Sequence, residues 1–162
     1  MKLKTQIVAI ALALGVSTSL VSSQDRQPRQ LPTATPTIEG VWQVARTGVN
    51  CDDPNQQLVG PFPAIMTFHR DGTMTGDTGA LEGFTSEYGS WQREPGSQNY
   101  SFRELSLSTD ENGALAIRAT ITANVHLTDA NSFTYSATIQ VFDADGNLIG
   151  AFCGRTTGTR FE

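Results

Sequence analysis

The 162-residue sequence has few basic residues, histidines and cysteines, and each shortage argues against a class of function. Its 11 lysines and arginines are outnumbered by 16 aspartates and glutamates, which gives a net charge of −5. Nucleic-acid binding needs clustered basic side chains, so we expect no nucleic-acid partner. The two histidines and two cysteines lie too far apart along the chain for a zinc-binding pattern. We therefore predict no metal and no cofactor.

The N-terminal apolar run is too short for a membrane span. Residues 7–16 form a run of about ten residues, whereas a spanning helix needs roughly twenty. Lys2 and Lys4 precede the run, and small and polar residues follow it up to Ser23, which is the order typical of a secretory signal peptide. We predict that residues 1–23 are cleaved and that the protein is secreted or periplasmic, without a stable membrane span. An uncleaved anchor is the alternative.

The rest of the chain has room for one domain. Residues 24–37 are rich in glutamine, proline and threonine and lack periodic apolar positions, which predicts a disordered linker. Residues 38–162 have the length of an ordinary single domain. Cys51 and Cys153 are its only cysteines, and an oxidising exterior favours one disulfide between them. Two unpaired thiols are the alternative.

Alternating segments predict β-strands. Odd positions from Leu115 to Leu127 are apolar while the even ones are mostly polar, and Phe133 to Val141 repeats the pattern. A period of two indicates a strand with one buried face. The turn-forming residues 128–131 between the two segments predict a long hairpin. Shorter strands are predicted at residues 41–46, 64–68, 73–75, 88–93, 100–106 and 148–156, with a tail at 159–162.

This strand content predicts an all-β fold. About eight antiparallel strands with short connections must protect their edges, and closing the sheet removes the edges altogether. We predict a single up-and-down antiparallel β-barrel, with a β-sandwich as the alternative. In a barrel the first and last strands are neighbours, so a Cys51–Cys153 bridge crosses the seam. The long segments 52–63 and 77–87 are predicted as loops at the barrel mouth.

The start of this domain, Gly40-Val41-Trp42, resembles the glycine-any-tryptophan signature of lipocalins and their calycin relatives. The resemblance implies that Trp42 closes the bottom of the barrel and that an arginine of the last strand, Arg155 or Arg160, packs over it. Two features depart from the family: the Thr-Asp-Tyr signature is absent at residues 127–130, and no C-terminal helix follows the last strand.

The wider pattern is similar to that of a group of small secreted bacterial β-barrel proteins of uncharacterised function. The segments that carry this resemblance cover most of the domain, but they imply no activity. They are Gly40-Val41-Trp42, residues 68–72, Gly89-Ser90-Trp91, residues 145–148 and residues 158–162.

No catalytic constellation stands out, so we predict no catalytic residue. His69 and His126 lie beside turns, and most of the acidic residues also fall in turns, where aspartate bonds its own backbone. An enzyme that uses a barrel pocket, such as a cyclase or isomerase, stays an alternative. Its polar groups would come from residues such as Tyr88, Tyr135, Arg118 or His126.

The apolar face suggests a binding function. Barrels of about eight strands either fill their interior or hold one small ligand, and the alanines at 119, 123 and 137 leave space unless neighbouring side chains fill it. We predict a lipocalin-like binding module for a small hydrophobic or amphipathic ligand. The alternative in another class is an extracellular interaction or inhibitor barrel that contacts a protein partner through residues 24–37 and the mouth loops. The predicted ligand-lining residues are Trp42, Phe68, Trp91, Tyr100, Ile121, Phe133 and Tyr135.

Overall fold

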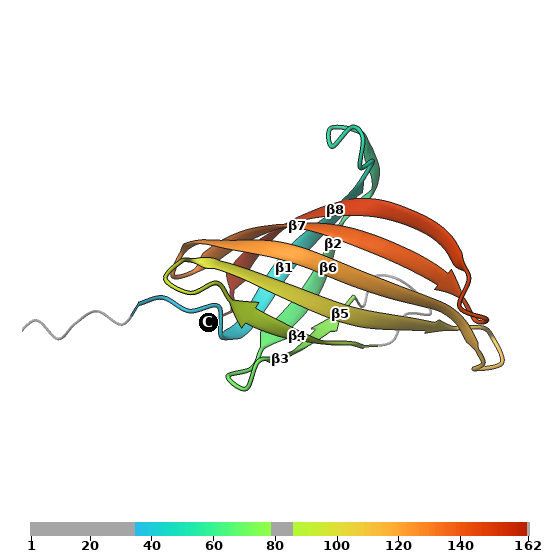
Figure 1. Cartoon of the computed structure of the whole chain (residues 1–162), viewed down its shortest axis with the longest axis horizontal. Coiled ribbons are helices and arrows are strands. Elements are labelled where there is room, and N and C mark those ends of the chain that lie inside the picture. Colours follow the sequence, from blue (N-terminus) through green and yellow to red (C-terminus); the bar gives the residue numbers. More distant parts are fainter. Residues whose placement is uncertain (1–34, 79–85, 162) are drawn as a thin grey trace, which may run out of the picture. The chain divides into compact units, whose positions relative to one another are not determined.

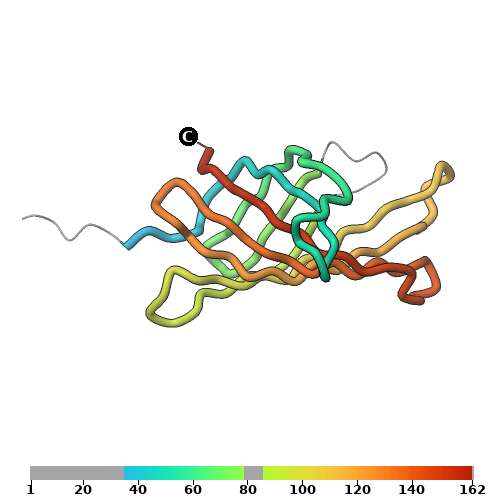
Figure 2. Tube along the Cα trace, turned by 90° about the horizontal axis from the view of Figure 1, so that it is seen from above, coloured from blue at the N-terminus to red at the C-terminus, as the bar shows by residue number. Residues whose placement is uncertain are grey.

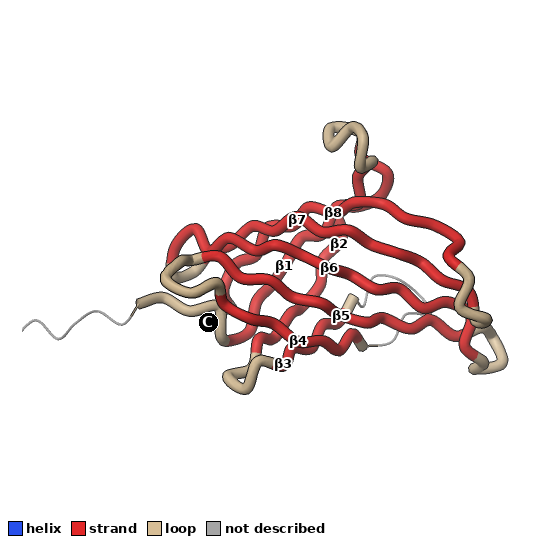
Figure 3. Tube along the Cα trace, viewed as in Figure 1, coloured by secondary structure: helices blue, strands red, loops and turns tan. Residues whose placement is uncertain are grey.

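The computed structural model describes residues 35–78 and 86–161, and its regular structure in these ranges consists of β-strands (Figure 3). The predicted signal peptide and most of the predicted linker lie outside the described residues, as do residues 79–85. No helix long and apolar enough to cross a membrane occurs in the described ranges. The strands are β1 (Gly40–Val49), β2 (Gln57–Phe68), β3 (Thr73–Asp77), β4 (Glu87–Arg93), β5 (Asn99–Thr109), β6 (Leu115–Asp129), β7 (Ser132–Asp143) and β8 (Leu148–Arg160).

The eight strands form a closed barrel in up-and-down order (Figure 1). Each strand pairs antiparallel with the next, and β1 pairs antiparallel with β8 along Trp42↔Arg160 to Val49↔Cys153. Figure 2 shows this seam, with β8 running alongside β1. Closure gives every strand two neighbours, so none of the eight is an edge strand along its whole length. The predicted barrel is confirmed, and the sandwich alternative is wrong.

The alternating segments pack as predicted. In β6, every second residue from Ala119 to Leu127 is buried, and β7 continues the pattern with Phe133, Tyr135 and Ala137. The two strands pair from Ile117↔Asp143 to Asp129↔Ser132 as one long hairpin. Period-two sequences therefore place one row of side chains inside the barrel.

Several strands are longer than the sequence patterns predict. The expected mouth loop 52–63 is wrong in its second half, because β2 begins at Gln57 and continues through Pro61 and Pro63. A proline breaks a strand only where its missing N–H is needed. In the described structure β2 pairs with β3 only over Ile65–Phe68, so the proline segment has a side with no partner there. The last strand also continues without a break to Arg160.

Aromatic side chains fill one end of the barrel, which we call the closed end. The ring of Trp42 meets that of Phe133 edge-on at 4.8 Å, and Phe68 lies 6.1 Å from Phe133. The guanidinium of Arg160 stacks 4.2 Å from the centre of Trp42 and donates hydrogen bonds to the backbone oxygens of Thr37, Glu39 and Ala130. Arg160 therefore occupies the place that the lipocalin resemblance implies, whereas Arg155 is exposed.

Gly40 makes this closure sterically feasible. Its φ of 127° lies in a region that favours glycine, and a Cβ at this position would approach Arg160 Nη1 to 2.6 Å. The glycine of the Gly40-Val41-Trp42 signature thus admits the arginine that covers the tryptophan.

A disulfide links the two strands of the seam, β1 and β8, away from the closed end. Cys51, just after β1, is bonded to Cys153 in β8, and the two residues are 102 positions apart in the chain. The predicted pairing is confirmed, and the alternative of two unpaired thiols is wrong.

Candidate functional site

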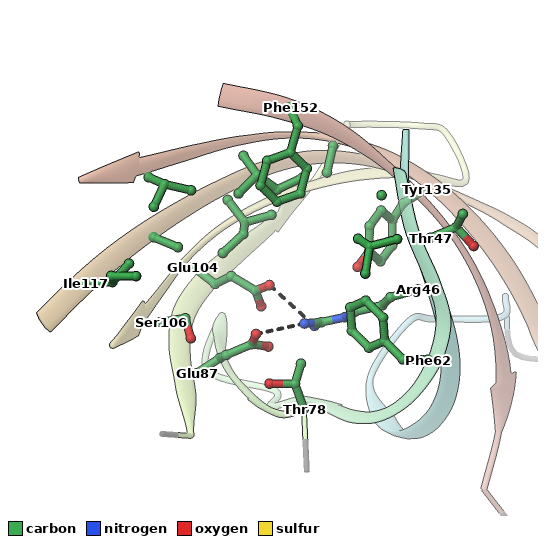
Figure 4. Close-up of a pocket in the computed structure, with 17 residues that line it drawn as sticks. Arg46, Thr47, Phe62, Thr78, Glu87, Glu104, Ser106, Ile117, Tyr135 and Phe152 are labelled. Carbon is green, nitrogen blue, oxygen red and sulfur yellow. Dashed lines mark hydrogen bonds and ion pairs between the residues drawn. The ribbon is translucent and has the colours of Figure 1, made fainter. Parts of the chain in front are cut away.

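A cavity of about 190 Å³ lies inside the barrel, away from the closed end. Its wall is mainly apolar and is built from residues of β1, β2 and β4–β8, together with Thr78 just after β3 (Figure 4). We call this region the hollow end. Its principal apolar lining residues are Phe62, Ile117, Ile121, Ile139, Val141 and Phe152.

Small residues on adjacent strands explain why this end is hollow. Gly48 of β1 pairs with Gly154 of β8, which pairs with Ala137 of β7. At this level of the barrel, three neighbouring strands therefore each contribute at most one methyl group. At the closed end, by contrast, the inward side chains include indole and phenyl rings. Ala119 of β6 adds another short side chain to the cavity wall. Neighbouring side chains take part of the space that these small residues leave, because a Cβ at Gly48 would meet Val59 at 2.6 Å and one at Gly154 would meet Ile139 at 3.1 Å, and the rest remains as the cavity.

Three buried charged side chains meet at the wall of this cavity. Arg46 of β1 donates from Nη1 to Glu87 Oε1 of β4 at 2.7 Å, and Nη2 lies 3.3 Å from Glu104 Oε1 of β5. The side chains of Arg46, Glu87 and Glu104 are only 10%, 4% and 0% exposed. Figure 4 shows all three pointing into the barrel interior, with the guanidinium between the two carboxyl groups and Phe62. We call these residues the charged cluster.

The alternation of side chains along the strands places the charged cluster inside the barrel. Arg46 follows the inward residues Trp42 and Val44 in β1, and Glu104 follows Phe102 in β5. Glu87 gains its place through Gly76, because a Cβ at Gly76 would collide with the Glu87 carboxyl group. The rows of inward-facing residues that carry the aromatic core at one end of the barrel therefore carry charged side chains further along the strands.

The hydrogen bonding of the cluster is incomplete. Among the described residues, Arg46 Nε, Glu87 Oε2, Glu104 Oε2 and Ser106 Oγ are buried and have no hydrogen-bond partner. Buried polar atoms nearly always have partners, and an unmet one costs about 1–3 kcal/mol. Each carboxyl group thus uses one oxygen on Arg46 and leaves the other unpaired.

Burial changes the pKa values of residues in and beside the charged cluster. Burial raises the pKa of Glu104 to about 8, an effect that the charge of Glu87 reinforces and Arg46 opposes. Burial also raises the pKa of Tyr135, to about 12. For Arg46, burial disfavours the charge, but Tyr135, Glu104 and Glu87 outweigh it and raise the pKa. At neutral pH the cluster therefore holds a charged Arg46 and a largely protonated Glu104.

The predicted ligand-lining residues divide between the two ends. Ile121 and Tyr135 line the cavity. The other five pack together as core on the closed-end side of the cavity, with Trp91 partly buried against them: Trp42, Phe68, Trp91, Tyr100 and Phe133. Of the three alanines expected to leave space, 119 and 137 line the cavity, and Ala123 is packed in the core.

Sequence reasoning missed the charged cluster. Arg46 and Glu104 stand at inward positions of alternating strands, which is the one signal that could have identified them. The two histidines lie elsewhere: His69 and His126 are both exposed, and His126 Nδ1 contacts Asn99 Oδ1 at 2.9 Å. Residues 35–78 and 86–161 contain no group of three or more His, Cys, Asp or Glu side chains that could hold a metal ion.

Comparison with known proteins adds no family assignment. No protein-family model matches the sequence, and no curated protein matches it. The eight-strand barrel is consistent with a lipocalin-like fold, and the features of the molecule that bear on its function are the cavity and the charged cluster.

Proposed function

We propose that this protein is a secreted, lipocalin-like binding module that holds one small, mainly apolar molecule at the hollow end of its barrel. The observation that carries the proposal is the apolar cavity of about 190 Å³ with a buried, incompletely bonded charged cluster in its wall. Enclosed apolar pockets with a few convergent polar groups are the usual form of a small-molecule site.

The cavity volume limits the size of the ligand. An engineered cavity of about 150 Å³ in another protein binds benzene, so about 190 Å³ suits one ring with a short substituent. Burying about 150 Å² of apolar surface contributes about 4 kcal/mol, which by itself corresponds to a dissociation constant near 1 mM. Tighter binding therefore requires a polar contact with the charged cluster.

Three further features support a lipocalin-like exported protein. The Gly40-Val41-Trp42 signature lies under Arg160 at the closed end, as the family resemblance implies. The Cys51–Cys153 disulfide suits an oxidising compartment. The N-terminal sequence has the order of a signal peptide.

Filling the cavity tests this proposal. Ala137→Leu puts a larger side chain into the cavity, whereas Thr138→Leu makes an equally apolar change at an exposed position of the same strand. We expect 2-phenylethanol to cause saturable amide shifts near Ile121 and Ile139 in the wild type and in Thr138→Leu, as followed by NMR titration. Ala137→Leu is expected to abolish them. Shifts that persist in Ala137→Leu, or no shifts in the wild type, would contradict the proposal.

A barrel-pocket isomerase or cyclase is the second candidate, and the raised pKa of Glu104 favours it. A carboxyl group with a pKa of about 8 can act as a general acid near neutral pH, and Tyr135 lines the same cavity. In this case a bound compound is converted to an isomer of equal mass, and Glu104→Gln binds it without converting it. Chromatography of the incubated compound measures both, and unchanged compound with the wild type counts against this candidate.

A further inference from the structure

Two carboxyl oxygens of the charged cluster have no hydrogen-bond donor in the described part of the chain. It combines two carboxyl groups with one guanidinium, and the guanidinium already contacts both. Among the described residues, the cluster atoms without any hydrogen-bond partner include one oxygen on each carboxyl group, Glu87 Oε2 and Glu104 Oε2, and one guanidinium nitrogen, Arg46 Nε. A molecule that satisfies both oxygens with Glu104 ionised must supply hydrogen-bond donors, and its positive charge would balance the second carboxylate.

We propose that the hollow end binds a small lipophilic cation, in which a primary ammonium group is set against Glu87 and Glu104 and a ring-sized apolar body fills the cavity. This inference rests on the proposed binding function and names the chemistry of its ligand. An ammonium group carries three donors and no acceptor, which matches the two unpaired carboxyl oxygens and the hydroxyl of Ser106.

An anionic ligand suits this site poorly. A carboxylate would bring a third acidic group to a wall that already holds Glu87 and Glu104, and like charges repel strongly away from water. Nη1 and Nη2 of Arg46 already contact the two glutamates, so such a ligand would share the guanidinium with two other carboxyl groups. A neutral alcohol can make one hydrogen bond but leaves the charge of the cluster unchanged.

The ammonium group can reach the cluster from the cavity. Arg46, Glu87, Glu104 and Ser106 all contribute to the cavity wall. Their unpaired atoms are covered in the ligand-free structure, and the terminal torsion of a glutamate is soft and roughly two-fold. Rotation about this torsion turns the free oxygen of a carboxyl group toward the cavity, and the bound ammonium replaces the contact that the carboxyl group gives up with Arg46.

Cation binding is linked to proton release. The titratable groups that face Glu104 are Arg46 on β1, Glu87 on β4 and Tyr135 on β7. Glu104 has a pKa of about 8 and is mainly neutral at pH 6, whereas a bound ammonium favours its ionised form. Affinity for the cation therefore rises from pH 6 to pH 8, and binding releases protons to the buffer.

A matched set of phenyl compounds tests the proposal on the disulfide-bonded barrel. We expect isothermal titration calorimetry to show that 2-phenylethylamine binds at least about tenfold more tightly than 2-phenylethanol, the effect of one charge-assisted hydrogen bond. Phenylacetate should bind more weakly than the alcohol. Titrations at pH 6 and pH 8, in buffers of different ionisation enthalpy, measure the linked proton.

Three isosteric variants locate the effect. Glu87→Gln and Glu104→Gln should each weaken 2-phenylethylamine about tenfold and change the alcohol by no more than about twofold. Glu111→Gln makes the same chemical change at an exposed turn residue and should change neither. The comparison of ligands on the wild type decides the question even if a cluster variant fails to fold.

The possible outcomes distinguish the cation proposal from the proposed binding function. Equal affinity for amine and alcohol, or stronger binding of phenylacetate, overturns the cation proposal and leaves the binding function standing. Absence of binding by all three compounds overturns both.

Discussion

The two ends of this barrel are built from the same strands but differ in what fills them. At the closed end, Trp42 and Phe133 pack edge-on and Arg160 covers the indole. At the hollow end, Gly48, Gly154 and Ala137 lie side by side on three strands, and Gly48 and Ala137 border the cavity. Strand alternation decides which side chains point inward, and side-chain size decides whether the interior is full.

The two ends also use arginine differently. Arg160 donates to three backbone oxygens and stacks on Trp42, so it acts as a structural clamp. Arg46 contacts two carboxyl groups, and its Nε has no partner in the described part of the chain. A satisfied arginine stabilises a core, whereas an incompletely bonded cluster beside a cavity is suited to receive a ligand.

Truncating one large residue at each end should give the largest contrast. We expect Trp42→Ala to lower the free energy of unfolding by about 4–5 kcal/mol, because it removes a fully buried indole from tight packing. Ile121→Ala should cost only about 2 kcal/mol, since its side chain already borders a void. Urea denaturation of both variants measures the difference. Equal costs would show that the hollow end is packed as tightly as the closed end.

Removing the cation from the charged cluster should have the next largest effect. Arg46→Met leaves Glu87 and Glu104 buried without their partner, and we expect a loss of about 3–4 kcal/mol at pH 8. The loss should shrink at pH 5, where Glu104 is protonated and needs no counter-charge. Arg155→Met is the control, because Arg155 is exposed, and it should change stability by less than about 0.5 kcal/mol. A cost for Arg46→Met as small as that of the control would mean that the cluster is solvated.

The disulfide should matter more for the hollow end than for the closed end. Replacing Cys51 and Cys153 together by serine removes a link across 102 positions, and we expect a loss of about 2–4 kcal/mol. Hydrogen exchange should speed up more at Val49, beside the link, than at Trp42, where Arg160 still holds the seam. Faster exchange at Trp42 than at Val49 would reverse this assignment.

The smallest expected effect per step, counted for one pH unit, is a pH slope from the hollow end. The pKa of Glu104 is about 8 in the folded protein and about 4.5 ordinarily, so between these values the folded state holds a proton that the unfolded state has lost. Stability therefore falls as pH rises from about 5 to about 8, by at most about 1.4 kcal/mol per pH unit. Denaturation across this range should show the slope in the wild type and in Glu111→Gln but not in Glu104→Gln. A slope that survives in Glu104→Gln would assign it to another group.

Much of the fold could be read from local patterns. The alternation from Leu115 to Leu127 predicted the β6–β7 hairpin, and the two cysteines predicted the bridge across the seam. The extension of β2 through Pro61 and Pro63 was missed, because proline favours a loop unless its position in the sheet needs no N–H, and in the described residues β3 pairs with β2 only from Ile65 onward.

The candidate site could be read only in part. Ile121 and Tyr135 were predicted as lining residues and do line the cavity. The charged cluster was missed because a charged residue in a strand usually faces solvent, and the partners of Arg46 are 41 and 58 positions away. No local spacing shows that these three side chains share one interior.

The amino-acid sequence by itself determined the inward rows, the closed sheet and the residues that join its first and last strands. These follow from a period of two and from cysteine chemistry, which are local or pairwise properties. Only the tertiary structure decided which end is hollow and which charges meet there. A void depends on the combined volume of side chains from strands that are distant in sequence, and that sum exists only once the barrel has closed.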